Sequence, residues 1–119
     1  MSLGKLTPPV DPTTAISEEI AAIYQECYGE PVDGIRTYVL DDSVICVIDM
    51  ALLVHERVIL AAGRGADTIR EVRKDFQETI GPTFVAAVEH HTGRKVIGFV
   101  SDTHLDPPFT IEFFRLASN

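Results

Sequence analysis

The sequence lacks tryptophan, has only two cysteines, and contains no long uninterrupted hydrophobic run. Cys27 and Cys46 lie outside any Cys-x-x-Cys pair and are too few for a disulfide scaffold, so we expect both to be buried, reduced thiols. The longest apolar run, residues 50–60, is interrupted by Glu56 and Arg57 and is too short to span a bilayer. We therefore expect no direct membrane insertion.

Positive charge is also scarce. Ten Lys and Arg against 18 Asp and Glu give a formal net charge of −8. Such a surface repels phosphate backbones and anionic lipid, so the charge argues against nucleic-acid partners and against docking on a membrane through a basic patch. The N-terminus has no apolar signal-peptide core, and we expect a cytoplasmic protein.

The length of 119 residues suits one domain. We predict a disordered, Pro- and Thr-rich tail over residues 1–13 and a single domain over residues 14–117. Within it, hydrophobic periodicity and turn residues predict two helical segments and four strands. The helical segments are expected at 14–28 and 52–92, and the strands at 35–40, 44–50, 95–101 and 110–116.

The second helical segment is interrupted by glycines and a proline. It is expected to be one long, bent helix or two helices meeting at Gly81-Pro82, because proline lacks an N–H and clashes with the preceding turn. Its buried stripe is predicted from residues at spacings of three and four, with Arg73 off that stripe. These residues are Ile69, Val72, Phe76 and Ile80. The link 102–109 contains two prolines and is expected to be a loop longer than a tight turn.

The order α-β-β-α-β-β predicts an α+β two-layer sandwich. In this fold a four-stranded antiparallel sheet carries the N-terminal helix and the long bent helix on one face. Two helices do not cover both faces of four strands, so the other face is expected to expose apolar side chains such as Tyr38, Ile45, Val47 and Phe99, or the residues that alternate with them. An exposed apolar sheet face favours a homodimer.

One stretch suggests metal chemistry. The sequence from Ser101 to His104, Ser-Asp-Thr-His, resembles the first metal-binding motif of calcineurin-type phosphoesterases. A two-metal site needs several further ligands, yet only fifteen residues follow His104 and none is histidine. A single-metal site built from Asp102, His104 and Asp106, joined by His90 or His91, is a weaker hypothesis. The alternative is a solvated polar loop, and we predict neither a metal nor a cofactor.

No other motif predicts catalysis. The pair His55-Glu56 has Ile59 where a zinc protease needs its second histidine, and Gly63-Arg64-Gly65 lacks the Lys-Ser/Thr ending of a phosphate loop. Arg64 could nevertheless hold an anion.

Asp49 interrupts an apolar strand. Because a buried carboxylate needs a partner, we expect it to face solvent at the strand end or to pair with an arginine. The spacing shows no Ser-His-Asp or Cys-His arrangement, so no catalytic residue is assigned.

Two long stretches carry a family resemblance. They are "YGEPVDGIRTYVLDDSVICVI" at 28–48 and "EVRKDFQETIGPTFVAAVEHHTGRKVIGFVSDTHLDP" at 71–107. Together they resemble a family of small bacterial proteins, formerly a domain of unknown function, that is named after the MpsC component of a Na+-translocating, membrane-potential-generating system; the YbcI proteins look like members. The resemblance implies an accessory role beside an ion or inorganic-carbon transport system, with a membrane protein as partner. It supplies no catalytic residues.

Two functions therefore stay open. The first is a non-catalytic cytoplasmic binding protein that contacts another protein or a membrane system. The second is a small-molecule or metal-binding domain with hydrolase activity, which would use Asp102, His104 and Asp106, with Arg64 or Arg94 for an anion.

Overall fold

The computed structural model describes residues 11–63 and 65–118. Three helices and four strands follow one another along the chain, and they are α1 (Pro12–Tyr28), β1 (Gly34–Leu40), β2 (Ser43–Asp49), α2 (Val54–Ala61), α3 (Ala66–Thr92), β3 (Val96–Leu105) and β4 (Pro108–Leu116). The predicted α+β class and the order of helical and strand regions are confirmed. Most of the predicted N-terminal tail lies outside the described residues, and α1 begins at Pro12.

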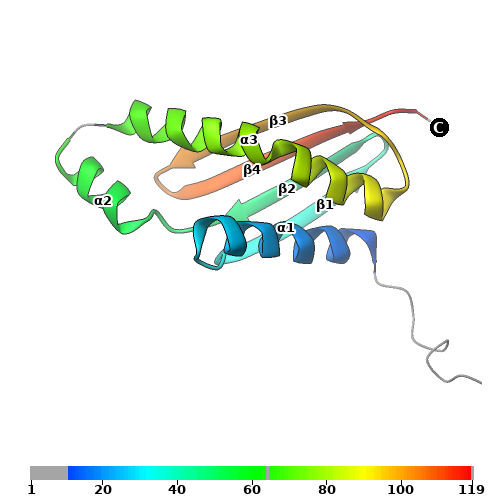
Figure 1. Cartoon of the computed structure of the whole chain (residues 1–119), viewed down its shortest axis with the longest axis horizontal. Coiled ribbons are helices and arrows are strands. Elements are labelled where there is room, and N and C mark those ends of the chain that lie inside the picture. Colours follow the sequence, from blue (N-terminus) through cyan, green and yellow to red (C-terminus); the bar gives the residue numbers. More distant parts are fainter. Residues whose placement is uncertain (1–10, 64, 119) are drawn as a thin grey trace, which may run out of the picture.

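The four strands form one antiparallel sheet in the order β1-β2-β4-β3. In Figure 1, α1 and α3 lie side by side over one face of this sheet, as the two-layer prediction required. This inner face carries the core, with Val44, Cys46, Ile48 and Phe114 from the two central strands fully buried. The helices contribute Ile16, Ile20, Phe84 and Val88 to the same core.

Capping residues in the sequence set both the first and the last turn of helix α1. The Asp11 side chain accepts a hydrogen bond from the Thr13 N–H at 2.9 Å, and Pro12 occupies the first turn, where a missing N–H costs nothing. At the other end Gly29 adopts φ 76°, a left-handed conformation that glycine takes without a Cβ penalty. These caps fix the length of the helix that packs on β1.

The link between β3 and β4 differs from the prediction. Residues 102–105 belong to β3, Pro108 and Phe109 belong to β4, and only Asp106 and Pro107 form the turn. The prediction of a long loop was therefore wrong. The paired strands satisfy the backbone groups of residues 102–105 across the hairpin, and prolines are tolerated at a turn and at the first residue of a strand.

Helix α3 is continuous through Gly81-Pro82, so the alternative of two helices meeting there was wrong. Gly81 is buried against the Phe99 ring, where a Cβ would approach within 3.1 Å, and Pro82 faces outward. The interruption lies earlier, between α2 and α3. One position of the predicted stripe was wrong, because Val72 is 61% exposed and Arg73 is buried in its place, while Ile69 is buried as predicted.

No helix of the described residues lies over the opposite, outer face of the sheet. The strand register places sixteen residues on this outer face, in four rows that cross the sheet in the order β1-β2-β4-β3. The rows are Leu40-Ser43-Arg115-Gly98, Tyr38-Ile45-Phe113-Val100, Arg36-Val47-Ile111-Asp102 and Gly34-Asp49-Phe109-His104. Phe99 packs toward Phe84 in the core, so of Phe99 and its alternate it is Val100 that takes the outer position.

Candidate functional site

A carboxyl group lies in the middle of the fold. Glu112 occupies an inward position of the central strand β4 and is fully buried. Its Oε1 accepts a hydrogen bond of 2.7 Å from the Tyr24 hydroxyl of α1, while Oε2 has no hydrogen-bond partner among the described residues. The sheet therefore encloses a half-satisfied acidic side chain directly beneath the helical layer.

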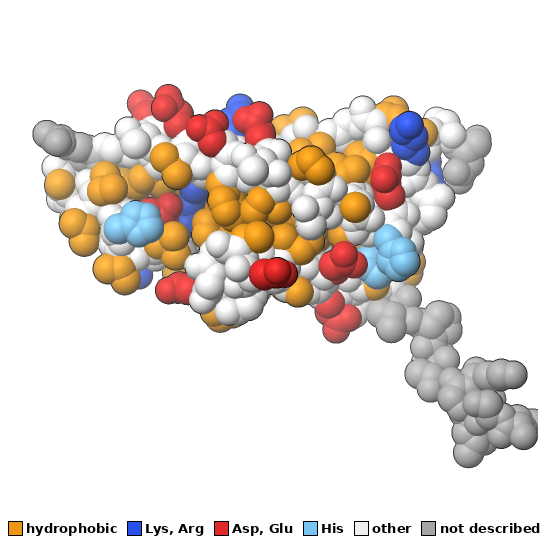
Figure 2. All heavy atoms as spheres, viewed as in Figure 1, with side chains coloured by type: hydrophobic (Ala, Val, Ile, Leu, Met, Phe, Trp, Pro, Cys, Tyr) orange, Lys and Arg blue, Asp and Glu red, His pale blue; other side chains and the backbone are white. Residues whose placement is uncertain are grey.

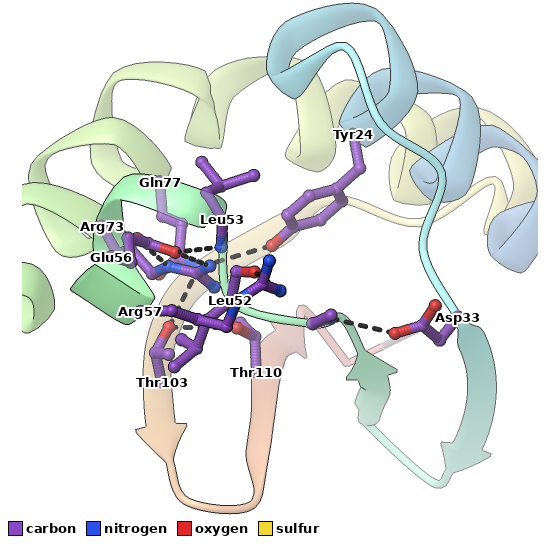
Figure 3. A network of polar contacts seen from close by, with 11 residues as sticks. Tyr24, Asp33, Leu52, Leu53, Glu56, Arg57, Arg73, Gln77, Thr103 and Thr110 are labelled. Atoms are coloured by element: carbon purple, nitrogen blue, oxygen red, sulfur yellow. Dashed lines mark hydrogen bonds and ion pairs between the residues drawn. The ribbon is translucent and has the colours of Figure 1, made fainter. Parts of the chain in front are cut away.

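Gln77 of α3 connects this carboxyl to the outer hairpin. Its Oε1 accepts a hydrogen bond of 2.6 Å from Ser101, and its Nε2 lies 3.3 Å from Thr103 and 3.4 Å from the Tyr24 hydroxyl. The Thr103 hydroxyl is in turn 3.0 Å from that of Thr110 on β4. Figure 3 shows four of these residues, Tyr24 of α1, Gln77 of α3, Thr103 of β3 and Thr110 of β4, pointing toward one another. We call this set, Tyr24, Gln77, Ser101, Thr103, Thr110 and Glu112, the polar core.

Beside the polar core lies a buried ion pair. The Arg73 guanidinium of α3 donates through Nε and NH2 to both oxygens of Glu56, at 2.8 and 2.6 Å. Glu56 also accepts from the Leu53 N–H at 2.8 Å and so caps α2, and Arg73 lies 5.8 Å from the centre of the Tyr28 ring. Glu56 is the one buried residue of α2, so this pair is the main attachment of α2 to the rest of the fold.

The enclosure changes the protonation of several groups. Burial raises the pKa of Glu112 to about 7, although the hydrogen bond from the Tyr24 hydroxyl acts in the opposite direction. Burial and the neighbouring Glu112 raise the pKa of Tyr24, and burial raises the pKa of the Cys46 thiol to about 11. For Glu56, burial alone would raise the pKa, but the hydrogen bonds from Arg73 and Leu53 lower it overall.

These groups form a structural interior. Tyr24, Gln77 and Glu112 are each at most 1% exposed, so a substrate would have no route to them without local opening. A deprotonated thiolate at Cys46 is disfavoured by the same burial. The Glu112 carboxyl of the polar core has a pKa raised toward neutral pH, and hydrogen bonds through Tyr24 and Gln77 connect it to α1 and α3.

The metal-ligand candidates lie elsewhere. Asp102 and His104 are both exposed on the outer face of β3 and line one shallow hollow of about 240 Å³. His104 stacks on Phe109 and its Nδ1 lies 2.9 Å from the Pro107 carbonyl oxygen. Asp106 lies in the turn and lines a different groove, beside Arg57. Within residues 11–63 and 65–118, no group of three or more His, Cys, Asp or Glu side chains could hold a metal ion.

The residues considered for binding an anion, and Asp49, do not join the metal-ligand candidates in one site. The Arg94 guanidinium is already used, because it donates to the Asp42 carboxylate at 2.5 Å and to the Asp41 and Ala117 carbonyl oxygens. Arg64 lies outside the described residues. Asp49 ends β2 and is exposed, as the sequence predicted.

The remaining histidines and cysteines are distributed over the helices and β2. His91 lies 2.7 Å from Glu19 of α1, and the rings of His90 and His91 meet edge to face. Cys46 is buried as predicted, but Cys27 is exposed, so that part of the prediction was wrong.

A second apolar surface lies at the end of the molecule formed by α2. Val54 and Val58 are 65% and 64% exposed and lie one helical turn apart, and Ile59 is also exposed. We call these three residues the tip surface. Hydrophobic side chains gather over α2 in Figure 2, whereas acidic side chains line the outer edge of α3. The fold leaves these three side chains uncovered by other described residues.

Sequence reasoning missed the polar core and the ion pair. A signal for Glu112 was present, because it alternates with outward Ile111 and Phe113 and shares its face with Phe114. Arg73 and Gln77 lie four residues apart on the line that joins Ile69 to the core residue Phe84. A stripe defined only by hydrophobic residues passes over such positions.

Of three comparisons with known proteins, one gives a match. A family model described as Na+-translocating membrane potential-generating system (MpsC) matches residues 12–118, which is nearly the whole chain. No curated protein matches, and no solved structure matches. In the part of the chain that the structure describes, no helix has the length and hydrophobicity needed to cross a membrane.

The raised pKa of Glu112 predicts a pH dependence of stability. The folded state keeps the proton up to about pH 7, while the unfolded chain releases it near the ordinary value of 4.5. The free energy of unfolding should therefore fall as pH rises through this window, by roughly 3 kcal/mol at 1.36 kcal/mol per pKa unit. In Glu112→Gln this contribution is absent, so the variant should gain stability relative to wild type between pH 4.5 and 8 in urea titrations. Glu78→Gln, at an exposed position, is the control, and a Glu112→Gln difference that is constant with pH would contradict the assignment.

The buried ion pair predicts a non-additive pair of substitutions. Arg73→Met should destabilise the fold by about 3 kcal/mol, because it leaves the Glu56 carboxylate buried without its partner. The double variant Glu56→Leu, Arg73→Met should recover most of this loss, since neither charge remains. Arg70→Met removes an exposed partner of Asp67 and should cost less than about 1 kcal/mol. Equal losses for Arg73→Met and Arg70→Met, measured by chemical denaturation, would show that the buried pair has no special role.

Proposed function

Because the chain belongs to the MpsC family, we propose that it is a non-catalytic binding subunit of a membrane-potential-generating system. It acts in the cytoplasm, as a homodimer, beside membrane proteins that move ions or inorganic carbon. Its own part is to bind another protein of the system. The premise for the system is the family match over residues 12–118.

The observation that carries this proposal is the distribution of side chains. The polar core and the Glu56–Arg73 ion pair are enclosed, whereas large apolar side chains are exposed on the outer face and on the tip surface. Catalytic sites need reacting groups that a substrate can reach, and binding sites need apolar area that a partner can cover. The exposed pattern is that of a binding protein.

The two apolar surfaces suit two different partners. The outer face extends across all four strands, which fits a second copy of the chain in a symmetric contact. The tip surface lies on α2, a short helix held mainly by one ion pair, and an exposed helical stripe fits the groove of another protein. The membrane-embedded subunits of the system are the proposed partner at this tip.

Binding to those subunits tests the proposal. Tagged chain is mixed with the detergent-solubilised membrane proteins of the host's own Na+-translocating system, and the retained fraction is measured against chain concentration. We expect wild type to bind and the double variant Val54→Asp, Val58→Asp to bind about 10-fold or more weakly, since two anchor side chains become charged. Both residues are largely exposed, so the fold should be retained.

Thr83→Asp is the matched control, because it adds negative charge at an exposed position of α3 away from the tip. It should bind as wild type does. Absence of binding by wild type would overturn the proposed function. An equal loss in Thr83→Asp would show that general charge, and not the tip surface, controls the contact.

A further inference from the structure

The charges of the outer face follow a pattern. Four charged residues point outward from the strands: Arg36 on β1, Asp49 on β2, Asp102 on β3 and Arg115 on β4. They sum to zero on a chain whose formal net charge is −8. Two copies of an acidic protein repel each other least where each presents a neutral surface.

Two of these charges stand at opposite edges in the same row. Arg36 lies on the edge strand β1 and Asp102 on the edge strand β3, in the row that reads Arg36-Val47-Ile111-Asp102. Three strand spacings separate them, about 14 Å, so they cannot meet within one chain. Neither forms a salt bridge within the described residues.

The centre of the face is apolar. The neighbouring row Tyr38-Ile45-Phe113-Val100 has no charged side chain, and Val47 and Ile111 extend it into the row of Arg36. Tyr38 and Val100, at its two ends, are 46% and 62% exposed. An uncharged centre with charges toward the margins is the anatomy of a protein interface.

We infer that a second copy of this chain covers the outer face, related by a two-fold axis parallel to the strands, with Arg36 of each copy paired to Asp102 of the other. This inference rests on the proposed homodimer and adds its geometry. A rotation about an axis along the strands exchanges the two edges of the sheet and keeps each row opposite itself. It sets Arg36 against Asp102 twice, Tyr38 against Val100, and Ile45 against Phe113.

The same rotation brings no like charges together. Arg115 meets Ser43, and Asp49 meets Phe109. A two-fold axis in the plane but perpendicular to the strands would exchange the rows instead. That arrangement would place Arg36 against Tyr38 and Asp102 against Val100, each without an opposite charge, which is unfavourable. Of the two aligned packings, only the parallel axis is electrostatically complementary.

The twist between the two packed sheets still allows Arg36 of one copy to contact Asp102 of the other. Packed sheets are rotated by about 30°, and an edge strand lies about 7 Å from the axis, so opposed edge residues shift by about 4 Å. The arginine side chain is long enough to bridge such an offset, and its guanidinium can contact a carboxylate bidentately.

Charge reversal tests this arrangement by sedimentation equilibrium of the full chain at micromolar concentration. Arg36→Asp and Asp102→Arg each create two like-charge pairs and should raise the dimer dissociation constant about 100-fold or more. The double variant Arg36→Asp, Asp102→Arg re-creates both pairs with exchanged signs and should dimerise within about 10-fold of wild type. Arg70→Asp, which reverses a charge on α3, is the control and should dimerise as wild type does.

The possible outcomes distinguish the proposal that the chain forms a homodimer from the proposal about the position of its two-fold axis. A wild-type chain that stays monomeric overturns both the homodimer and its geometry. A dimer that tolerates the single reversals, or that the double variant does not restore, overturns the geometry alone. These dimerisation measurements do not depend on whether membrane proteins bind the tip surface.

A second measurement serves if a reversed variant fails to fold. In a Cys27→Ser background, Arg36→Cys chain mixed with Asp102→Cys chain should be joined by a short bismaleimide into a covalent dimer. Either chain alone should join far less, because two copies of residue 36 lie at opposite edges. Equal cross-linking of the mixture and of the separate chains would contradict the axis.

Discussion

The Glu112 carboxyl lies where the helical layer meets the sheet, and its need for partners constrains everything around it. A buried carboxyl that finds no hydrogen bond costs several kcal/mol, so Tyr24 of α1 must bring its hydroxyl to Oε1. Gln77 of α3 reaches the same hydroxyl and holds Ser101 and Thr103 of β3. One acidic group thus ties both helices and the β3–β4 hairpin into a single arrangement, which an apolar core of similar volume would specify less sharply.

The polar interior and the apolar exterior are connected. Tyr24, Gln77 and Glu112 occupy inward positions that hydrophobic side chains fill in most two-layer folds, while both helices sit on that side of the sheet. Among the described residues no helix lies on the other side, so Ile45, Val47 and Phe113 of the two central strands face outward, and α2 carries Val54 and Val58 on its free side. The chain therefore encloses its polar core and exposes apolar side chains on the outer face and on the tip surface.

Much of this fold follows from local rules, and the exceptions have local causes. Helix α1 has Pro12 in its first turn and Gly29 beyond its end, and the two hairpins have turn residues at Asp41 and at Asp106. The length of β3 was not predictable in this way, because residues 102–105 look like a polar loop until β4 lies beside them. Arg73 was placed outside the buried stripe for a similar reason, since its partner Glu56 is seventeen positions away on another helix.

The sequence by itself determined the class of the fold, the order of its elements and the apolar character of one uncovered sheet face. These properties depend on hydrophobic period, caps and turn residues, which act over a few neighbouring positions. Only the tertiary structure decided which polar residues are buried, that Asp102 and His104 face outward along a strand while Asp106 turns away, and that Arg36 and Asp102 share a row. Such relations depend on strand register and helix placement. These are set by contacts between residues far apart in the chain, where the free energy of one pairing depends on all the others.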